Sequence, residues 1–546
     1  MTGLGETLKL ARMNKDYTTP LTSLPESFQQ EFGEVIQGAI SGFDRLRLRG
    51  TLRHLFKASV MEAYLNASRV LLKDFGTFAE GITRRIKAGV YALAEKEQRP
   101  YVYLPSCQTS KEDTARAIAT RDHIEQGLIA ILGCVEPCLS YTVRGDRETK
   151  QIHLVLGQRR GMHYYYYYQH PVVGFMQFRL QSWFPFTLNV NLNGREWMAR
   201  QLDQAGVAYQ KRDNCFVWIA DLPRAQALLQ QQWEFDWAPF LSQWLAVCHP
   251  LCQEICQPIL QQYYWSISDS EYATDVLFKD TASLGRWYPR LVQHGISSFA
   301  SPDVMRFLGR RVPTSTGRVC GQFQGEIISD LKHRPEGIRV KHSLHGNSLK
   351  VYDKQGSVLR VETTIVRPAE FKVYRTAEND PDGKRSWREL RRGLADMPRR
   401  AQVSHAANQR YLTALATVSG TTRLSDLVQQ VCRPIVQAGQ RYRALNPWSP
   451  ADGALLRAIS RGEFAINGLR NRDLQGLLYT GKVSATEQRR RASAITRKLR
   501  LLRAHGVLKK VSGTHRYVLT ANGRMIVTAL LAAPQADVDK LSQIAV

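Results

Sequence analysis

The sequence predicts an α+β protein with two antiparallel-sheet-containing α+β units, a helical and basic linker, and a winged helix at the C-terminal end. Three observations lead to this fold class. Apolar and polar residues alternate, as on half-buried strands, in stretches between residues 43 and 192 and between 338 and 365. Stretches with apolar residues at helical spacing separate them. Beyond residue 450, three helices, a hairpin and a helix follow one another, which is the order of a winged helix.

The expected elements can be placed in chain order. In the first unit, strands are expected at 43–50, 101–104, 127–135, 163–170 and 175–192, and a hairpin at 139–156. Helices are expected at 52–97, at 111–125 and from 193. A helix, a hairpin and a helix then occupy 196–232, and an apolar helical stretch covers 236–262. A three-stranded meander is expected at 338–365. The last module is expected to have helices at 452–461, 470–478, 485–505 and 521–532 and a hairpin at 507–519.

Turn-rich and basic stretches divide these elements into domains. A chain of 546 residues has room for three or four domains of about 150 residues each. The boundaries that we expect are a flexible lead-in at 1–30, an N-terminal α+β domain at 31–235, a second α+β domain with the meander at 236–375, a basic linker and helix at 376–449, and a winged-helix nucleic-acid-binding domain at 450–546.

The charge of the chain points to a polyanionic partner. Lys and Arg number 75 against 48 Asp and Glu, and the formal net charge is +27. This excess repels itself in a folded protein unless a polyanion offsets it, and nucleic acid is the polyanion that basic domains most often bind. No apolar run approaches the roughly 20 residues that a membrane span needs, and the N-terminus lacks a secretory signal pattern. Nine scattered cysteines fit a reducing, cytoplasmic compartment.

The most basic helix is expected within the C-terminal module. Residues 484–516 contain ten Lys or Arg and one acid, Glu487. Apolar residues recur at helical spacing and can pack inward, so the basic side chains point mostly outward. We expect this helix and the following hairpin to contact nucleic acid, and the alternative is a solvated basic helix that binds another protein. The nucleic-acid-binding residues predicted here are Arg489, Arg490, Arg491, Arg497, Lys498, Arg500, Lys509, Lys510 and Arg516.

A second basic stretch precedes this module. Residues 384–411 carry eight Lys or Arg against two acids. We expect the stretch either to follow a phosphate backbone or to be a flexible charged linker.

A run of five tyrosines lies between His163 and His170. Tyrosine favours strands, and alternate rings on a strand point to opposite faces. One face, with Tyr164, Tyr166 and Tyr168, is therefore a candidate for stacking on bases, and a tyrosine of this run is also a candidate nucleophile. The alternative is an aromatic core strand.

The meander carries polar residues that suit phosphate chemistry. Tyr352, Asp353, Arg360 and Glu362 are the predicted catalytic residues. The length of its second turn decides which of them meet. A two-residue turn places Asp353, Arg360 and Glu362 on one face, where two carboxylates can bind Mg²⁺ or Mn²⁺. A three-residue turn instead places Lys350, Tyr352, Lys354, Arg360 and Glu362 on one face. The alternative to a functional site in either arrangement is a set of cross-strand salt bridges.

The order Lys350-Val351-Tyr352-Asp353-Lys354 followed by Leu359-Arg360-Val361-Glu362 resembles a segment of rolling-circle replication initiators of plasmids and filamentous phages. The resemblance covers about fifteen residues, and it implies strand cleavage by a tyrosine with a glutamate that helps to bind the metal. The chain lacks the His-hydrophobic-His triplet of those initiators. As a whole it also resembles a multi-copy bacterial protein family associated with mobile elements, which implies a mobile element or a plasmid-like replicon as its setting.

Three functions follow as hypotheses. The first is a DNA-binding protein that also cleaves or transfers strands with the help of Mg²⁺ or Mn²⁺ bound by Asp353 and Glu362. The second is a regulator that binds DNA or RNA without catalysis. The third is a component of a ribonucleoprotein, in which the tyrosine run stacks on single-stranded bases.

Overall fold

The computed structural model describes residues 24–533 apart from short gaps. The gaps are 311–313, 316–317, 320–326, 335–336, 378–379, 381–382, 419–423, 438, 462–463, 465–467, 482 and 512–513. The expected lead-in at 1–30 lies mostly outside the described residues, and so do residues 512–513 of the hairpin expected at 507–519.

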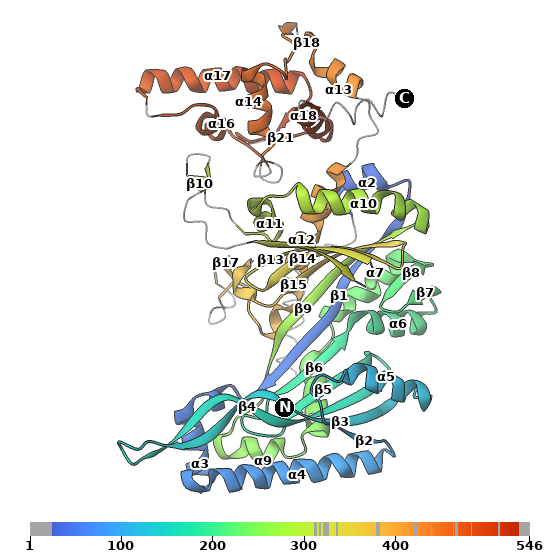
Figure 1. Cartoon of the computed structure of the whole chain (residues 1–546), viewed down its shortest axis with the longest axis vertical. Coiled ribbons are helices and arrows are strands. Elements are labelled where there is room, and N and C mark those ends of the chain that lie inside the picture. The colour runs from blue at the N-terminus through green and yellow to red at the C-terminus, as the bar shows by residue number, and fades with distance from the viewer. Residues whose placement is uncertain are drawn as a thin grey trace. The chain divides into compact units, whose positions relative to one another are not determined.

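The fold is a mixed α+β structure, as predicted, but the strands expected in two separate α+β units belong to one large sheet (Figure 1). The described residues contain one large sheet and several two-stranded hairpins. The order of strands across the large sheet is β12 (Ile328–Arg334), β13 (Gly337–Leu344), β14 (Asn347–Lys354), β15 (Val358–Ile365), β9 (Tyr264–Phe278), β1 (Ile36–Thr51), β6 (Leu188–Asn193), β5 (Gly174–Gln181), β4 (Ile152–His170), β3 (Gly127–Gly145) and β2 (Tyr101–Leu104). Neighbours such as β1 and β6, or β13 and β14, are antiparallel, whereas β2 and β3 are parallel.

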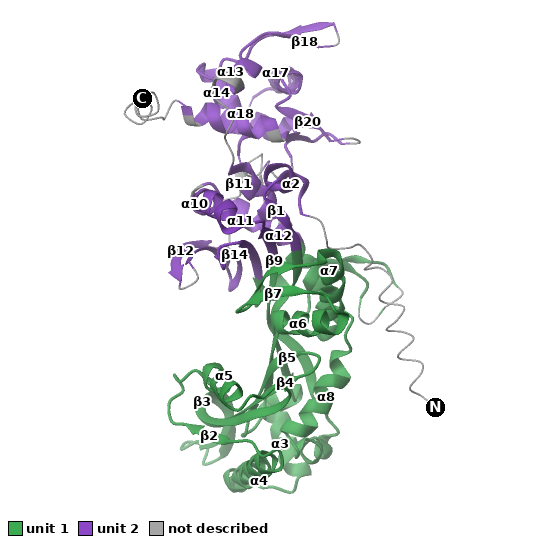
Figure 2. Cartoon of the chain, turned by 90° about the vertical axis from the view of Figure 1, so that its right-hand side faces the viewer, with its two compact units in different colours: residues 1–22, 40–274, 364–405 green, residues 23–39, 275–363, 406–546 purple. Residues whose placement is uncertain are grey.

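The chain divides into two compact units (Figure 2). Unit 1 comprises residues 1–22, 40–274 and 364–405, and unit 2 comprises 23–39, 275–363 and 406–546. Divisions fall within β1, β9, β15 and α12 (Met397–Leu415), and each of these elements contributes residues to both units.

In unit 1, helices cover both faces of the sheet. One face of β4, β5 and β6 packs against α3 (Ala58–Ala67), α4 (Phe75–Lys96) and α8 (Trp237–Cys248) in a core that includes Ile82, Phe178 and Leu241. The other face packs against α5 (Lys111–Arg121) through Ala115 and Ile118. Because both faces are covered, β3 reads as a nearly continuous apolar run at 128–132 instead of alternating. The remaining elements of this unit are α6 (Gly194–Ala205), β7 (Tyr209–Arg212), β8 (Cys215–Ile219), α7 (Leu222–Gln230), α9 (Cys252–Cys256), β16 (Lys372–Arg375) and β17 (Ser386–Glu389).

In unit 2, strands β12 to β14 pack against helices on one face. The helices are α10 (Thr281–Ser297), which contacts all three strands, and the second half of α12 (Met397–Leu415), whose Tyr411 is hydrogen-bonded to His342 of β13; Phe307 of α11 (Ser301–Phe307) packs against Tyr411. His342 of β13 is buried, and its ring is hydrogen-bonded at Nδ1 to Ser329 Oγ (2.7 Å) and at Nε2 to Tyr411 Oη (3.1 Å). Burial lowers the pKa of His342 to about 4, so the ring is neutral at pH 7.

The C-terminal part of unit 2 has its own apolar core. Its elements are α13 (Leu424–Val431), β18 (Ile435–Gln437), β19 (Gln440–Tyr442), α14 (Pro450–Ile459), α16 (Asn471–Leu478), α17 (Ala485–Ala504), β20 (Leu508–Lys510), β21 (Tyr517–Leu519) and α18 (Ala521–Ala532). Ile495, Leu499 and Leu502 of α17 point into this core, as the helical spacing predicts. Ser484 begins α17 by accepting a hydrogen bond from the Glu487 backbone N–H.

The basic stretch 384–411 is not a flexible linker. It contains β17 and most of α12, and the α12 residues Ala401, Ala407 and Tyr411 are fully buried. Part of the expected linker at 376–449 is therefore packed structure. The helix expected within 376–449 is α12, and it begins among the arginines of the basic stretch, at Met397.

Candidate functional site

The turn between β14 and β15 decides which meander residues meet. It spans residues 355–357, with Gln355 and Gly356 at positive φ (59° and 76°). Asp353 Oδ1 accepts a hydrogen bond from the Gly356 backbone N–H (2.9 Å), which stabilises this three-residue turn. The structure therefore has the second of the two arrangements expected for the meander.

Glu362 is the centre of a small polar group on this hairpin. Its carboxylate accepts hydrogen bonds from Lys350 Nζ and from Tyr352 Oη, the latter at 2.6 Å. Glu362 is 2% exposed, whereas Tyr352 is half-buried. Lys354 Nζ lies 5.9 Å from the centroid of the Tyr352 ring. We call Lys350, Tyr352 and Glu362 the hairpin group.

Two predicted catalytic residues are bound to other partners. Asp353 alternates to the opposite side of β14 from Tyr352 and binds the turn, so the expected pair of Asp353 and Glu362 around a metal ion is wrong. Arg360 is fully buried and donates from Nε and Nη2 to the two carboxylate oxygens of Asp275, at 2.6 and 2.8 Å. A guanidinium bound in this way cannot offset the charge on a phosphate in solvent.

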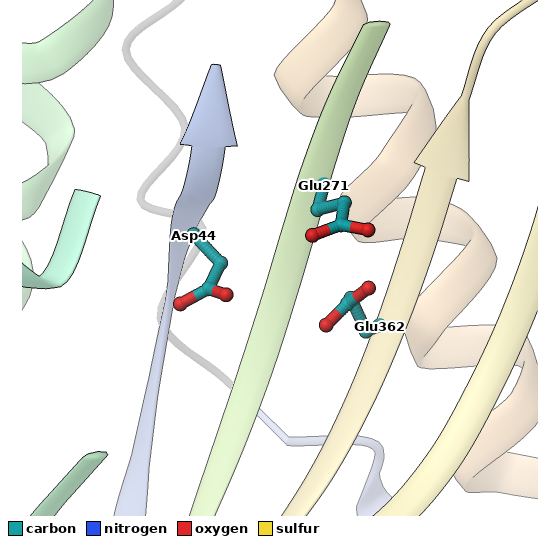
Figure 3. Close-up of side chains that lie close together, drawn as sticks. All are labelled: Asp44, Glu271 and Glu362. Carbon is teal, nitrogen blue, oxygen red and sulfur yellow. The ribbon is translucent and has the colours of Figure 1, made fainter. Parts of the chain in front are cut away.

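A different group of carboxylates meets on three neighbouring strands. Asp44 of β1, Glu271 of β9 and Glu362 of β15 each have a ligand oxygen within 4.8 Å of the others (Figure 3). Among the described residues this is the group of acidic, His and Cys side chains whose spacing suits a metal ion. Carboxylate oxygens are the ligands that Mg²⁺ and Mn²⁺ prefer. We call these three residues the carboxylate group.

Each member of the carboxylate group also has partners of its own. Arg195 lies 3.4 Å from Asp44, whose oxygens also accept from Asn214 Nδ2 at 3.0 and 3.2 Å. Arg45 donates to Glu271 at 2.6 and 2.9 Å. A metal ion would have to compete with these cations for the same oxygens.

Sequence reasoning missed Asp44 and Glu271. Asp44 lies within GFDRLRLRG, where it is the acid in a basic and apolar strand, and this contrast is the signal that was available. Glu271 is one of several acids in the stretch 269–275, and nothing in the sequence separates it from Asp269. The pairing of β1 and β15 with β9 brings the three residues together, and strand order is not readable from the local pattern.

The predicted basic residues of α17 and the following hairpin are accessible. Arg489, Arg490, Arg497 and Arg500 are exposed, and Arg491 and Lys498 are half-buried. The side chain of Arg490 is 82% exposed and lies 3.5 Å from Glu487. In the hairpin, Lys509 and Lys510 are exposed and Arg516 is half-buried.

A pocket lies beside these residues. It has a volume of about 630 Å³ and is lined by the start of α16, the middle of α17 and residues 514–517. Its basic lining residues are Arg470, Arg472, His515 and Arg516, and Thr496 contributes a hydroxyl group. The pocket therefore offers positive charge and hydrogen-bond donors to an anion.

The tyrosine run forms a core strand and has no exposed ring face. Tyr164, Tyr166 and Tyr168 pack into the core of α3, α4 and α8, and Tyr165 and Tyr167 pack against α5. Tyr166 is 2% exposed and donates a hydrogen bond to the Cys248 carbonyl (2.9 Å). Burial raises the pKa of all five phenols above the ordinary value of 10, which disfavours their use as nucleophiles. The predicted stacking of bases on Tyr164, Tyr166 and Tyr168 is therefore wrong, and the core alternative is right.

Comparison with known proteins adds no relative. No protein-family model, curated protein or solved structure matches the chain. Among the described helices, none combines the length and the apolar character that crossing a bilayer requires.

Proposed function

We propose that the protein binds nucleic acid, with DNA favoured, through a winged helix formed by residues 450–533. The observation that carries the proposal is the exposed row of arginines on α17. In this interpretation α14, α16 and α17 are the three helices, and β20 and β21 form the wing. An antiparallel bridge between Leu469 and Tyr517 adds the short third strand that a winged helix has between its first two helices.

The positions of the charges suit a duplex. The first half of α17, with Arg489 and Arg490, would enter the major groove, while Lys509 and Lys510 in the wing would contact backbone phosphates. The pocket between α16, α17 and residues 514–517 would take a phosphate group, since Arg470 and Arg472 line it. B-form DNA admits a helix into its major groove, whereas the deep and narrow major groove of duplex RNA does not, and this favours DNA.

Fluorescence anisotropy with a labelled 20-base-pair duplex tests the proposal. Replacing two arginines (Arg489→Gln with Arg490→Gln) should weaken binding by roughly 10- to 100-fold and reduce the slope of log K against log salt by about 1.8. The matched control replaces two exposed arginines of unit 1, Arg84→Gln on α4 with Arg224→Gln on α7. Equal duplex affinity of the wild type and the α17 variant would contradict the proposal.

A second candidate function is metal-assisted cleavage or transfer of a DNA strand, in keeping with a protein of a mobile element or plasmid-like replicon in the cytoplasm. The hydrogen bond from Tyr352 to Glu362 favours it, because a carboxylate can accept the phenol proton. The Tyr352 oxygen would then bond to phosphorus as the bond from phosphorus to the leaving sugar oxygen breaks, and Lys350 would protonate that oxygen. The oxygens of Asp44, Glu271 and Glu362 fit Mg²⁺ or Mn²⁺, which would supply positive charge near the phosphate.

A search for a covalent product tests this candidate. End-labelled single-stranded and duplex DNA would be incubated with the protein and Mg²⁺ or Mn²⁺, and adducts would be resolved on a denaturing gel. The variant Tyr352→Phe should abolish the adduct, and Glu362→Gln should slow its formation by about 10²- to 10⁴-fold. Tyr374→Phe, on an exposed tyrosine of β16, is the control. If no adduct forms with any substrate while binding persists, the protein is a binding protein without catalysis.

A further inference from the structure

Several arginines gather around the first residues of β9 in unit 1. On one side, β1 lies along β9, where Ser266 Oγ donates to the Arg49 carbonyl (3.3 Å) and Ser268 Oγ to the Arg47 carbonyl (2.8 Å). A second segment pairs with the same end of β9: Ser266 bridges Gly393, and the Ile267 N–H donates to the Arg392 carbonyl (2.7 Å). Arg49 and Arg392 are thus anchored by adjacent residues of one strand.

A third arginine lies buried near them. Arg400 of α12 is fully buried, and its Nη1 donates to Ser270 Oγ of β9 (3.0 Å) and to the Ile365 carbonyl (3.1 Å). Its Nε and Nη2 have no hydrogen-bond partner among the described residues. A buried guanidinium with two unused donors is costly, so its retention calls for an explanation. We call Arg49, Arg392 and Arg400 the arginine cluster.

The nearby carboxylates are already paired with other arginines. Asp269 and Asp396 are the acids whose charge reaches Arg400. Asp269 pairs with Arg47 at 3.2 Å. Asp396 pairs with Arg391 at 3.4 Å and with Arg399 at 3.0 Å. The three members of the cluster therefore form a positive surplus.

The pKa values show that the cluster members affect one another. Burial, followed by the charges of Arg392 and Arg179, lowers the pKa of Arg49. Burial and then the charge of Arg392 lower the pKa of Arg400 to about 9. Like charges this close destabilise the folded protein until an anion offsets them.

The side chains around the arginine cluster suit a single strand of nucleic acid. Tyr264, at the first residue of β9, is 37% exposed, and the Arg53 guanidinium lies 4.0 Å from the centroid of its ring. Beyond β1, Asn189 and Asn191 of β6 are in register with Arg49 and Arg47, so amides stand beside the guanidinium groups on one face of the sheet. Exposed aromatic rings stack on bases, arginines contact phosphates, and amides bond to base edges.

We propose that the arginine cluster and Tyr264 bind a single strand of nucleic acid, with its phosphates at Arg49 and Arg392 and a base on Tyr264. Arg47, whose side chain is 46% exposed, extends the phosphate contacts along β1. Buried Arg400 makes no contact with the strand and adds its positive charge from below. The inference rests on the proposed nucleic-acid binding and adds a second, single-strand site to it. It also gives the basic stretch 384–411 a phosphate-binding role.

The test measures binding and stability on the same full-length variants. Fluorescence anisotropy with labelled dT20 is followed from 50 to 200 mM salt for the wild type, Arg49→Gln, Arg392→Gln and the double variant. Each substitution should weaken binding by about 3- to 10-fold, and the double variant should reduce the salt slope by about 1.4. Without DNA, Arg392→Gln should raise the melting temperature at low salt, because it relieves repulsion. Arg84→Gln, on an exposed arginine of α4, is the control for one lost charge.

For Arg392→Gln the proposal expects a lower dT20 affinity but a higher melting temperature, whereas a purely structural role of Arg392 would lower the melting temperature. A lower melting temperature of Arg392→Gln with unchanged dT20 affinity would overturn the proposal. For the ring, Tyr264→Ala should weaken binding of dT20 but not of an abasic strand of equal length, and equal losses on both would exclude stacking. Heparin that binds the wild type as well as dT20 does, with the same loss in the double variant, would show a general polyanion site and overturn the single-strand assignment.

The two proposals fail separately. Substitutions at Arg49 and Arg392 should leave duplex affinity within about twofold, whereas Arg489→Gln with Arg490→Gln should leave dT20 affinity within about twofold. If Arg489→Gln with Arg490→Gln leaves duplex affinity unchanged while the dT20 results are as expected, the winged-helix proposal is contradicted. If Arg49→Gln and Arg392→Gln leave dT20 affinity unchanged while the duplex results are as expected, the single-strand site is contradicted.

Discussion

Arginines gather in two regions of this protein, on α17 and around the start of β9, and the two regions hold them differently. On α17 the arginines stand in water, as the 82% exposure of the Arg490 side chain illustrates. Around β9 they differ in burial: Arg392 is exposed, Arg49 is half-buried, and Arg400 has no exposed surface. Water and salt screen exposed charges well, but they screen a buried charge such as that of Arg400 poorly. The sequence alone does not distinguish the two regions, because both are basic stretches with few acids.

This difference decides whether a substitution changes binding alone or the free energy of unfolding as well. An exposed arginine can be removed from α17 with little effect on folding, so a loss of DNA binding there is easily interpreted. Around β9 the same substitution changes the free energy of unfolding as well, because mutual repulsion is part of the folded state. Buried arginines that are paired with a carboxylate form a third kind, with Arg360 and Asp275 as the example.

The largest effect is expected where a buried arginine loses its partner. The substitution Asp275→Asn leaves the Arg360 charge buried without its carboxylate and should cost about 3–5 kcal/mol of unfolding free energy. Urea denaturation measures this. As a control, Glu389→Gln removes an exposed partner of Lys372, at 55% and 60% side-chain exposure, and should change stability by less than about 0.5 kcal/mol. A cost for Asp275→Asn similar to that of the control would show that burial does not distinguish these arginines.

The next effect concerns buried histidines, which titrate where arginines do not. Burial lowers the pKa of His163 and of His342 to about 4, from about 6.5 in the unfolded chain. The unfolded state therefore binds more protons between pH 6.5 and pH 4, and stability should be complete above this window and fall as the pH drops through it. We expect on the order of 2 kcal/mol from each ring. Urea denaturation at several pH values tests this, and His342→Gln should flatten the curve. A pH-independent stability from 6.5 to 4 would contradict it.

A smaller effect should come from salt acting on the arginine cluster. Raising sodium chloride from 10 to 150 mM shortens the screening length from about 30 to about 8 Å and should stabilise the wild type by about 0.5–1 kcal/mol. The variant Arg392→Gln should respond less, since part of the repulsion is gone. Thermal denaturation of both proteins in the two salts provides the measurement. An equal response of the two proteins would locate the salt effect outside the cluster.

The smallest effect is expected on α17. The substitution Arg490→Gln should change the unfolding free energy by less than about 0.5 kcal/mol, because the side chain is exposed and its contact with Glu487 is a surface ion pair. Urea denaturation of the full chain measures it. A loss above about 1 kcal/mol would mean that α17 depends on its surface charge as the region around β9 does.

The predictability of this fold follows from how far apart the contacting residues lie. The mixed α+β class and the helices with apolar spacing, such as α17, could be predicted, because a helix is defined by neighbours within a few residues. The meander could be predicted too, but not the length of its second turn, which depends on the hydrogen bond from the Gly356 N–H to Asp353. The order of strands in the large sheet joins segments more than two hundred residues apart, and no local pattern encodes it.

The candidate site was predicted in part for the same reason. Tyr352 and Glu362 lie on one hairpin, and their meeting was one of two alternatives read from alternation. Asp44 and Glu271 join Glu362 only through the pairing of distant strands. The tyrosine run shows the opposite limit: alternation correctly predicts two faces, but only the packed helices decide that both faces are buried.

Strand β12 forms one end of the large sheet, and this position has a consequence for solubility. An edge strand presents unpaired backbone groups, which invite a second copy to extend the sheet. Ile328 and Leu331 of β12 are 60% and 41% exposed, which would favour such pairing. Lys332, His333 and Arg334 follow them and are exposed as well. Two copies aligned edge to edge would bring Lys332 and Arg334 of each copy close together, so the positive charge on which the proposed nucleic-acid binding depends would also oppose aggregation at this edge.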